Sequence, residues 1–313
     1  MTVWRSIEDV ELADSQSVVS IGNFDGVHLG HRHVLARARQ AADVRSASLP
    51  VVAVTFDPHP MRVIAPPKAP PALTGIPRRV RLLGEAGADH VLVLPFDTHM
   101  SQWSPEEFVD RVIVGALGAV TVVVGENFRF GAKAAGDVAF LREQGAQKGF
   151  DVDGLALDGE AQPWSSTYVR GLIADGDVAG AAHALGRFHA VDGVVVEGDK
   201  RGRELGFPTA NVPASRDFAV PADGVYAGWL HVEEGPAMPA AISVGTNPTF
   251  DGEDRRIESY VLDRDDLELY GRSVDTVFVA RVRGQVTFDG PQALIEQMHH
   301  DVAAVRRLLE SAS

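Results

Sequence analysis

The pattern of apolar residues changes near the middle of the chain, and this change constrains the fold more than any other feature. In the first half, short apolar runs alternate with segments of helix length, and the runs expected to form strands are 18–21, 51–56, 90–96, 120–124 and 152–157. Their apolar residues are continuous rather than alternating, which indicates burial on both faces. Repetition of strand and helix in this way predicts an α/β, Rossmann-like domain whose parallel sheet binds ligands at the carboxyl ends of its strands.

Beyond about residue 185 the sequence consists of short strands and turns. The expected strands are 191–196, 225–232, 240–244 and 257–262, followed by a long pair, 274–282 and 285–288, joined across Arg283 and Gly284. This pattern predicts an all-β domain, an antiparallel barrel or sandwich. A helix is expected to begin at Pro291, with an apolar stripe that packs on the barrel. We therefore expect two domains, residues 1–186 and 187–313.

The composition excludes several classes of function. The chain has 29 basic and 43 acidic side chains, and its net charge of −14 repels polyanions, so nucleic acid is not an expected partner. It has no cysteine, which excludes disulfides, thiolate nucleophiles and cysteine-ligated metal centres and fits a reducing compartment. No apolar run approaches the ~18 residues of a membrane span. A cytoplasmic protein without a membrane partner is expected.

Two glycine-rich segments are candidates for phosphate binding. The first, GNFDGVHLGH from Gly22 to His31, follows an apolar run and opens a predicted helix, where unpaired backbone N–H groups can meet a phosphate. The second, GDKRGRELGFPTAN from Gly198 to Asn211, is basic and lies among the strands of the second half. It has no GxxxxGK[ST] pattern and is not a P-loop. Two phosphate sites on two scaffolds predict two ATP-dependent reactions.

The first segment resembles the HxGH signature of the nucleotidyltransferase superfamily, in the form found in bacterial bifunctional riboflavin kinase/FAD synthetases. Three further segments resemble motifs of that family's first domain: TFDPHP at 55–60, GENFRFG at 125–131 and SSTYVR at 165–170. The resemblance covers the whole first half of the chain. It implies that this domain is an FMN adenylyltransferase.

The chemistry of that reaction explains the residue types in the first segment. The phosphate of FMN is already an anion and needs no base to attack the α-phosphorus of ATP, so the enzyme has to position the reactants and stabilise charge. We expect His28 and His31 to be the catalytic residues that do this for the triphosphate. The resemblance implies these ATP contacts: Gly22, Asn23, Phe24, Asp25, Gly30, Ser165, Ser166, Thr167 and Arg170. It implies these flavin contacts: Asp57, His59, Asn127, Phe128 and Arg129.

Simpler interpretations of these residues stay open. Ser165 to Thr167 could act only as a helix N-cap, and Asn127 could be a buried loop asparagine. Many relatives have aspartate at the position of Asn127, so no metal or acid–base role is assigned to it. A zinc site formed by His28, His31 and His33 is a rival interpretation, but the sequence offers no convincing fourth ligand.

The second segment resembles the signature of riboflavin kinase. Supporting segments of the same family are DGVY at 223–226, VGTNPTF at 244–250, IESYVLD at 257–263 and LYG at 269–271. The resemblance implies a β-barrel of the riboflavin kinase type with a terminal helix, and Mg²⁺ held by Thr209 and Asn211. The implied ATP contacts are Gly198, Lys200, Arg201, Gly206, Phe207, Thr209 and Asn211. Lys200 and Arg201 could instead be solvated charges, and Gly206 with Phe207 could be a structural turn.

Phosphorylation of riboflavin needs a base, because its 5′-hydroxyl is barely acidic. Glu258 is the expected catalytic base, although a glutamate on an alternating strand is usually only solvated. The predicted function is phosphorylation of riboflavin by ATP to FMN and ADP, followed by conversion of FMN and ATP to FAD and pyrophosphate. One alternative is an HxGH adenylyltransferase for another metabolite with an inactive kinase-like domain. Another is a non-catalytic sensor of flavin or nucleotide.

Overall fold

The computed structural model describes residues 1–12, 16–46, 49–156, 164–197, 207–233, 235–249 and 252–311. By compactness the chain divides into two units. The first comprises Met1–Pro70 and Gly75–Ser165, and the second comprises Pro71–Thr74 and Ser166–Ser313. Across the described ranges, no helix is long and apolar enough to span a bilayer.

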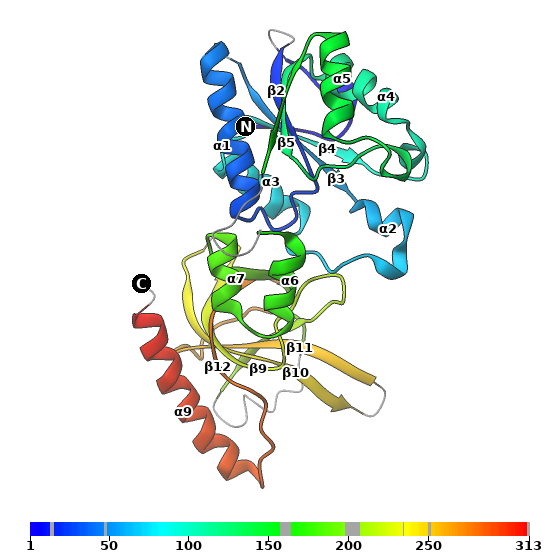
Figure 1. Cartoon of the computed structure of the whole chain (residues 1–313). Coiled ribbons are helices and arrows are strands. Elements are labelled where there is room, and N and C mark those ends of the chain that lie inside the picture. The colour runs from blue at the N-terminus through cyan, green and yellow to red at the C-terminus, as the bar shows by residue number, and fades with distance from the viewer. Residues whose placement is uncertain are drawn as a thin grey trace. The chain divides into compact units, whose positions relative to one another are not determined.

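The first unit is built on a six-stranded parallel sheet with the order β1-β4-β3-β2-β5-β6 (Figure 1). The strands are β1 (Thr2–Trp4), β2 (Ser17–Ile21), β3 (Val51–Asp57), β4 (His90–Pro95), β5 (Ala119–Gly125) and β6 (Asp151–Leu155). The predicted parallel sheet is confirmed, and the five expected runs form β2 to β6. Strand β1 was not expected, because three residues are too few to give a recognisable apolar run.

Helices cover both faces of this sheet. On one face lie α1 (Leu29–Arg45) and α3 (Ile76–Glu85), whose Leu35 and Leu83 pack with Ala53 and Val91 of the sheet. On the other face lie α4 (Pro105–Phe108), the π-helical segment η4 (Val109–Ala116) and α5 (Val138–Lys148). The short α2 (Pro60–Ile64) follows β3. Burial on both faces explains why the strands are continuously apolar.

The second unit contains a six-stranded antiparallel sheet with the order β7-β12-β9-β10-β11-β8. The strands are β7 (His189–Val194), β8 (Thr209–Pro213), β9 (Gly224–Val232), β10 (Met238–Thr249), β11 (Gly252–Val261) and β12 (Ser273–Arg283). A bridge between Val196, just beyond β7, and Asn211 of β8 joins the two edge strands, with the Val196 N–H donating to the Asn211 carbonyl at 2.8 Å. The sheet thus curves round into the predicted barrel.

Three helices belong to the second unit: α6 (Ser166–Ala174), α7 (Val178–Leu185) and α9 (Pro291–Glu310). The expected helix at Pro291 is confirmed, and its Val305 and Leu309 pack on the outer face of the sheet against Ala227 and Val279. Val178 of α7 joins the inner core of the barrel instead. The barrel therefore has a cap from α7 and an outer cover from α9 (Figure 1).

The strand expected at 285–288 was wrong. The chain leaves the sheet at Arg283, where β12 ends, and residues 284–288 are irregular up to α9. The side-chain amide of Gln285, rather than a strand backbone, donates to the Val244 carbonyl at 2.9 Å. Arg283 binds Asp301 of α9 through two nitrogens, with Nη2 2.7 Å from Oδ2, so the end of β12 is tied to the helix instead of to a further strand.

Candidate active sites

The segment between β2 and α1 forms a tight loop at the carboxyl end of β2. Phe24, Gly26 and Val27 all have positive φ, at 48°, 83° and 40°. Glycine tolerates this conformation, but a phenylalanine or a β-branched valine in it is strained by about 1–3 kcal/mol. The Val27 N–H donates to the Phe24 carbonyl at 3.1 Å, which closes the turn. The loop therefore keeps its shape because its surroundings hold it.

The loop ends at the two histidines predicted to be catalytic. His28 is the N-cap residue of α1, and its Nδ1 accepts a hydrogen bond from the His31 N–H at 3.4 Å. The two imidazoles are stacked, with 3.6 Å between ring centroids and 22° between planes. The ring of Phe24 packs edge-on against the ring of His31, with 5.2 Å between centroids. The structure thus brings both histidines together at the N-terminus of α1, where the helix dipole favours an anion.

Gly30 makes this stacking possible. A Cβ added at Gly30 would lie 3.1 Å from both Cε1 and Nδ1 of His28 and 3.4 Å from the Trp164 carbonyl oxygen. The atoms nearest to a Cβ at Gly22 would instead be those of the Phe24 ring, from 3.4 Å. A side chain at Gly30 would therefore displace a predicted catalytic residue.

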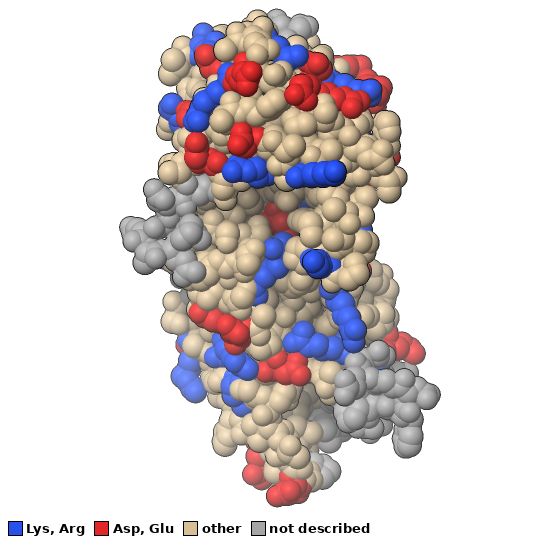
Figure 2. Space-filling view, turned by 45° about the vertical axis from the view of Figure 1, so that its right-hand side comes forward, with Lys and Arg blue, Asp and Glu red and all other residues tan. Residues whose placement is uncertain are grey.

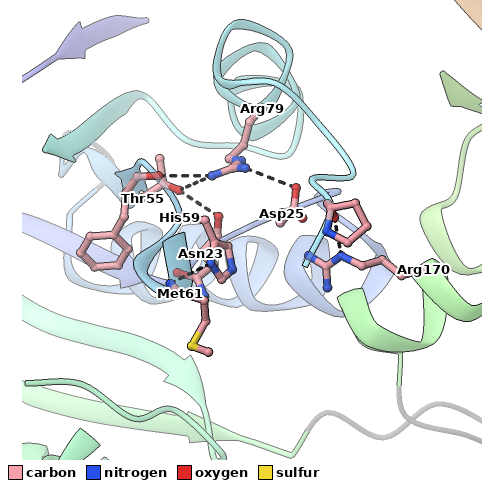
Figure 3. A network of polar contacts seen from close by, with 9 residues as sticks. Asn23, Asp25, Thr55, His59, Met61, Arg79 and Arg170 are labelled. Atoms are coloured by element: carbon pink, nitrogen blue, oxygen red, sulfur yellow. Dashed lines mark hydrogen bonds and ion pairs between the residues drawn. The ribbon is translucent and has the colours of Figure 1, made fainter. Parts of the chain in front are cut away.

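A buried polar network lies under the loop (Figure 3). The Asp25 carboxylate pairs with Arg79 of α3, 3.2 Å from Nη2, and both side chains are almost completely buried, at 1% and 4% exposure. Nη1 of Arg79 donates to Thr55 Oγ1 and to the Phe56 carbonyl, each at 3.4 Å. Thr55 Oγ1 in turn donates to the Asn23 carbonyl at 2.9 Å. The sequence did not mark Arg79 as a site residue, because an arginine in a basic amphipathic helix normally lies on a solvated face.

The predicted flavin contacts follow neighbouring strands of the same sheet. Asp57 ends β3, and Asn127 lies just beyond β5; these two strands flank β2, so their carboxyl ends share one edge with the histidine loop. Asp57, Asn127 and Arg129 are exposed. The ring of Phe128 stacks on Phe130, with 5.4 Å between centroids and 11° between planes. Polar side chains and the aromatic ring of Phe128 thus follow the strands on either side of the histidine loop.

His59 has a local role as well. It is the N-cap residue of α2, and its Nδ1 accepts a hydrogen bond from the Met61 N–H at 3.2 Å (Figure 3). Its assignment as a flavin contact stays a prediction.

The segment 165–170 falls where the two units meet in sequence. Ser165 belongs to the first unit, whereas Ser166, Thr167 and Arg170 belong to α6 of the second. Nε of Arg170 donates to the Pro71 carbonyl at 2.7 Å, a contact within the second unit. The assignment of these four residues to ATP stays a prediction.

The zinc interpretation gains no support. His33 is exposed on α1, and among the described residues no group of three His, Asp or Glu side chains is arranged to hold a metal ion. This observation concerns only His, Asp and Glu ligands, and Thr209 and Asn211 would bind a metal through hydroxyl and amide oxygens instead.

In the second unit, the register of β8 and β11 brings the predicted kinase residues together. Glu258 is directly opposite Asn211, and Tyr260 is opposite Thr209. Residues two apart on a strand share a face, and directly opposed side chains lie about 4.5–5.5 Å apart at Cβ. Ala210, between Thr209 and Asn211, and Ile257, next to Glu258, are buried in the barrel core. Thr209, Asn211 and Glu258 therefore lie on one face of the sheet, the face that is turned away from the core.

Hydrogen bonds connect the two residues predicted to bind the metal. Nδ2 of Asn211 donates to the Thr209 hydroxyl and to the Thr209 carbonyl, both at 3.2 Å. Asn211 is 6% exposed and Glu258 is half-buried. A hydroxyl, an amide and a carboxylate thus meet at one place on the barrel wall.

Of the remaining residues predicted for this site, the structure describes only Phe207. Phe207 is buried and packs edge-on against Tyr260, at 5.0 Å, and His299 of α9, at 5.2 Å. Its contact with ATP stays a prediction. Gly198, Lys200, Arg201 and Gly206 lie outside the described residues.

Comparison with known proteins assigns a class to each half of the chain. The sequence model of a family described as FAD synthetase matches residues 10–168, and that of a family described as riboflavin kinase matches residues 185–309. The part with the histidine loop is thus a nucleotidyltransferase, and the part with the barrel is a kinase.

Relatives resemble the chain over nearly its whole length. It is 37% identical to a bifunctional riboflavin kinase/FMN adenylyltransferase of Escherichia coli, with 98% of this chain and 97% of the relative covered. A protein of the same description from Bacillus subtilis is 33% identical, with 92% and 90% covered. A crystal structure titled as a macrolide-efflux protein from Streptococcus pneumoniae has the same fold, with a TM-score of 0.85, 31% identity and 97% and 98% covered. The chain belongs to the family of bifunctional riboflavin kinase/FMN adenylyltransferases.

Proposed function

We propose that this chain makes FAD from riboflavin in two consecutive steps at two separate sites. Riboflavin and ATP give FMN and ADP at the barrel, and FMN and ATP give FAD and pyrophosphate at the histidine loop. The observation that carries this proposal is that each family match contains its own cluster of predicted site residues, His28 with His31 and Glu258 with Asn211. We assign residues 1–186 to the adenylyltransferase and 187–313 to the kinase.

At the kinase site, Glu258 accepts the proton of the 5′-hydroxyl of riboflavin. The hydroxyl oxygen then forms a bond to the γ-phosphorus of ATP as the bond from that phosphorus to the β-phosphate oxygen breaks, and ADP leaves. The register supports this role, because Glu258 is opposite Asn211, one of the residues predicted to contact ATP. A positioned base of this kind contributes roughly 10²- to 10⁴-fold to the rate.

The donor set of this site fits Mg²⁺. Magnesium prefers hard oxygen ligands and keeps several of its waters, so one hydroxyl and one amide oxygen are sufficient when ATP supplies further oxygens. Donation through Nδ2 commits the nitrogen of Asn211 to Thr209 and leaves the amide oxygen as the atom suited to a cation. When bound, the ion would neutralise charge on the β- and γ-phosphates.

Replacement of Thr209 by valine tests this assignment, because it removes the hydroxyl and keeps the shape of the side chain. The expected result is that FMN formation needs a higher Mg²⁺ concentration, while FAD formation from supplied FMN keeps its Mg²⁺ dependence. An unchanged Mg²⁺ dependence of FMN formation would remove Thr209 from the metal site.

At the adenylyltransferase site, the histidines supply hydrogen bonds. An FMN phosphate oxygen attacks the α-phosphorus of ATP, and the bond to the β-phosphate oxygen breaks, so that pyrophosphate leaves. Nδ1 of His28 accepts the His31 N–H, and a neutral imidazole that accepts at Nδ1 carries its proton on Nε2. That proton is a donor for the departing pyrophosphate, whose charge increases in the transition state.

Charge and composition support small anions as partners and the cytoplasm as the location. Figure 2 shows basic side chains in local patches among acidic and uncharged ones, which suits a protein that meets ATP through a few placed cations. The net charge of −14 opposes nucleic acid as a partner, and the absence of cysteine fits a reducing compartment.

A time course with riboflavin, ATP and Mg²⁺, with the flavins separated by chromatography, tests the proposed function. FMN is expected first and FAD later. FMN that accumulates without FAD would contradict the adenylyltransferase assignment. Unchanged riboflavin, combined with adenylylation of another phosphorylated metabolite, would favour an adenylyltransferase with an inactive kinase-like domain. Binding of flavin and ATP without turnover would favour a sensor.

A further inference from the structure

Arg79 of α3 is a charged residue in the interior of the first unit, and none of the predicted motifs includes it. The residue is 3% exposed, and its partner Asp25 is 1% exposed. Burial of charge is costly, and a buried pair is often no more stabilising than apolar residues of the same volume. A contribution to stability alone is therefore a weak explanation for this pair.

The contacts of Arg79 connect the histidine loop to the end of β3. Nη2 binds the Asp25 carboxylate at 3.2 Å, and Nη1 reaches Thr55 Oγ1 and the Phe56 carbonyl at 3.4 Å. Thr55 holds the Asn23 carbonyl of the same loop at 2.9 Å. The planar guanidinium can make these contacts at once because its donors point in different directions (Figure 3).

The part of the loop that Arg79 holds is strained and leads directly to the histidines. Phe24 and Val27, on either side of Asp25, have positive φ values of 48° and 40°, and without the buried pair this segment would relax towards an ordinary conformation. His28 follows Val27 immediately, and its ring depends on a long hydrogen bond and a 3.6 Å stack with His31. Relaxation of the loop would therefore move both imidazoles.

We propose that Arg79 is a positioning residue for adenylyl transfer: through Asp25 and Thr55 it holds the strained loop that places His28 and His31. Arg79 does not touch the substrate in this proposal. The inference rests on the proposed function of the first unit, because it assigns the histidines to that reaction.

The test compares Arg79→Met with Arg81→Met. Arg81 is two residues further along α3, its side chain is 59% exposed, and it meets only Glu85, at 3.8 Å, among the described residues. For each full-length variant, kcat and KM for FMN are measured in FAD formation, together with FMN formation from riboflavin and the thermal melt. The kinase reaction of the same chain is an internal control for protein quality.

The expected result is a kcat for FAD formation that falls roughly 10- to 100-fold in Arg79→Met, since displacement of a catalytic group by about 1 Å costs on the order of 10²-fold. KM for FMN stays within about threefold, and FMN formation is unchanged. Arg79→Lys, which keeps the charge but cannot make the contacts to Asp25 and Thr55 together, recovers part of the lost kcat. Arg81→Met behaves as the unsubstituted protein.

Two results would overturn the proposal: an unchanged kcat in Arg79→Met, or a loss confined to KM for FMN. If Arg79→Met does not melt cooperatively, Arg79→Lys decides the matter, and an unchanged kcat in that variant would count against a positioning role. Failure of the proposed function is distinguishable, because then the unsubstituted protein would make no FAD from FMN.

Discussion

Replacement of Gly30 by alanine should separate activity from stability at the histidine loop. The new Cβ would lie 3.1 Å from Cε1 and Nδ1 of His28, whereas ordinary contacts begin near 3.4 Å. The imidazole would have to move by about 0.3–0.6 Å, and an effect of about 10² for a 1 Å displacement scales to roughly 10-fold here. This corresponds to about 1.4 kcal/mol in the barrier.

The same substitution should not weaken the fold. Gly30 lies in the first turn of α1, and alanine is favoured over glycine in helices by about 0.8–1 kcal/mol. The assay measures kcat for FAD formation from FMN and the thermal midpoint, with Gly171→Ala in α6 as the control because a Cβ there meets nothing within 4 Å. We expect Gly30→Ala to lose about 10-fold in kcat without a lower midpoint. Full activity in Gly30→Ala would refute the claim that the stacked position of His28 matters for catalysis.

Three further predictions concern other parts of the chain. Glu258→Gln should lower FMN formation by about 10²- to 10⁴-fold and leave FAD formation from supplied FMN unchanged. The control is Glu296→Gln, since Glu296 is an exposed glutamate of α9, and equal losses in both reactions would contradict the role of Glu258 as the base. Asp301→Asn weakens the ion pair with Arg283 and should lower the free energy of unfolding of the second unit by about 2–3 kcal/mol. This is less than the roughly 3–5 kcal/mol of a fully buried pair, because the Arg283 side chain is 19% exposed. Urea unfolding measures the change, and a value below about 0.5 kcal/mol would contradict the prediction. Burial lowers the pKa of His90 below its usual 6.5, although the nearby charge of Asp89 acts to raise it. The unfolded chain therefore binds the proton more readily, and stability should fall as the pH drops below about 6.5. His90→Asn should flatten this pH dependence of the thermal melt, and an unchanged slope would contradict the prediction.

The fold could be predicted largely because the two halves bury their strands differently. Continuous apolar runs such as 51–56 have helices on both faces, and this gave the five longer strands of the parallel sheet. The short β1 and the irregular segment 284–288 were not predictable in this way. Their conformation depends on tertiary partners, such as the Val244 carbonyl that Gln285 binds.

The candidate sites were predictable only where a motif gathers its residues locally. His28 and His31 lie one helical turn apart, so their proximity follows from the sequence. The position of Glu258 opposite Asn211 depends on the register of two strands whose paired residues are 47 positions apart in the chain, which periodicity cannot fix. Arg79 depends on packing of α3 under the loop, and nothing in its sequence context distinguishes it from the exposed Arg81.

Two independent catalytic sites in one chain should be able to act from separate molecules. The decisive experiment mixes Glu258→Gln protein with the double variant His28→Ala, His31→Ala, supplies riboflavin, ATP and Mg²⁺, and measures FAD by chromatography. We expect the histidine variant alone to stop at FMN, the Glu258 variant alone to leave riboflavin largely unchanged, and the mixture to make FAD. FAD from either variant alone at the unsubstituted rate, or a mixture that accumulates FMN and makes no FAD, would show that the two sites do not act independently as assigned.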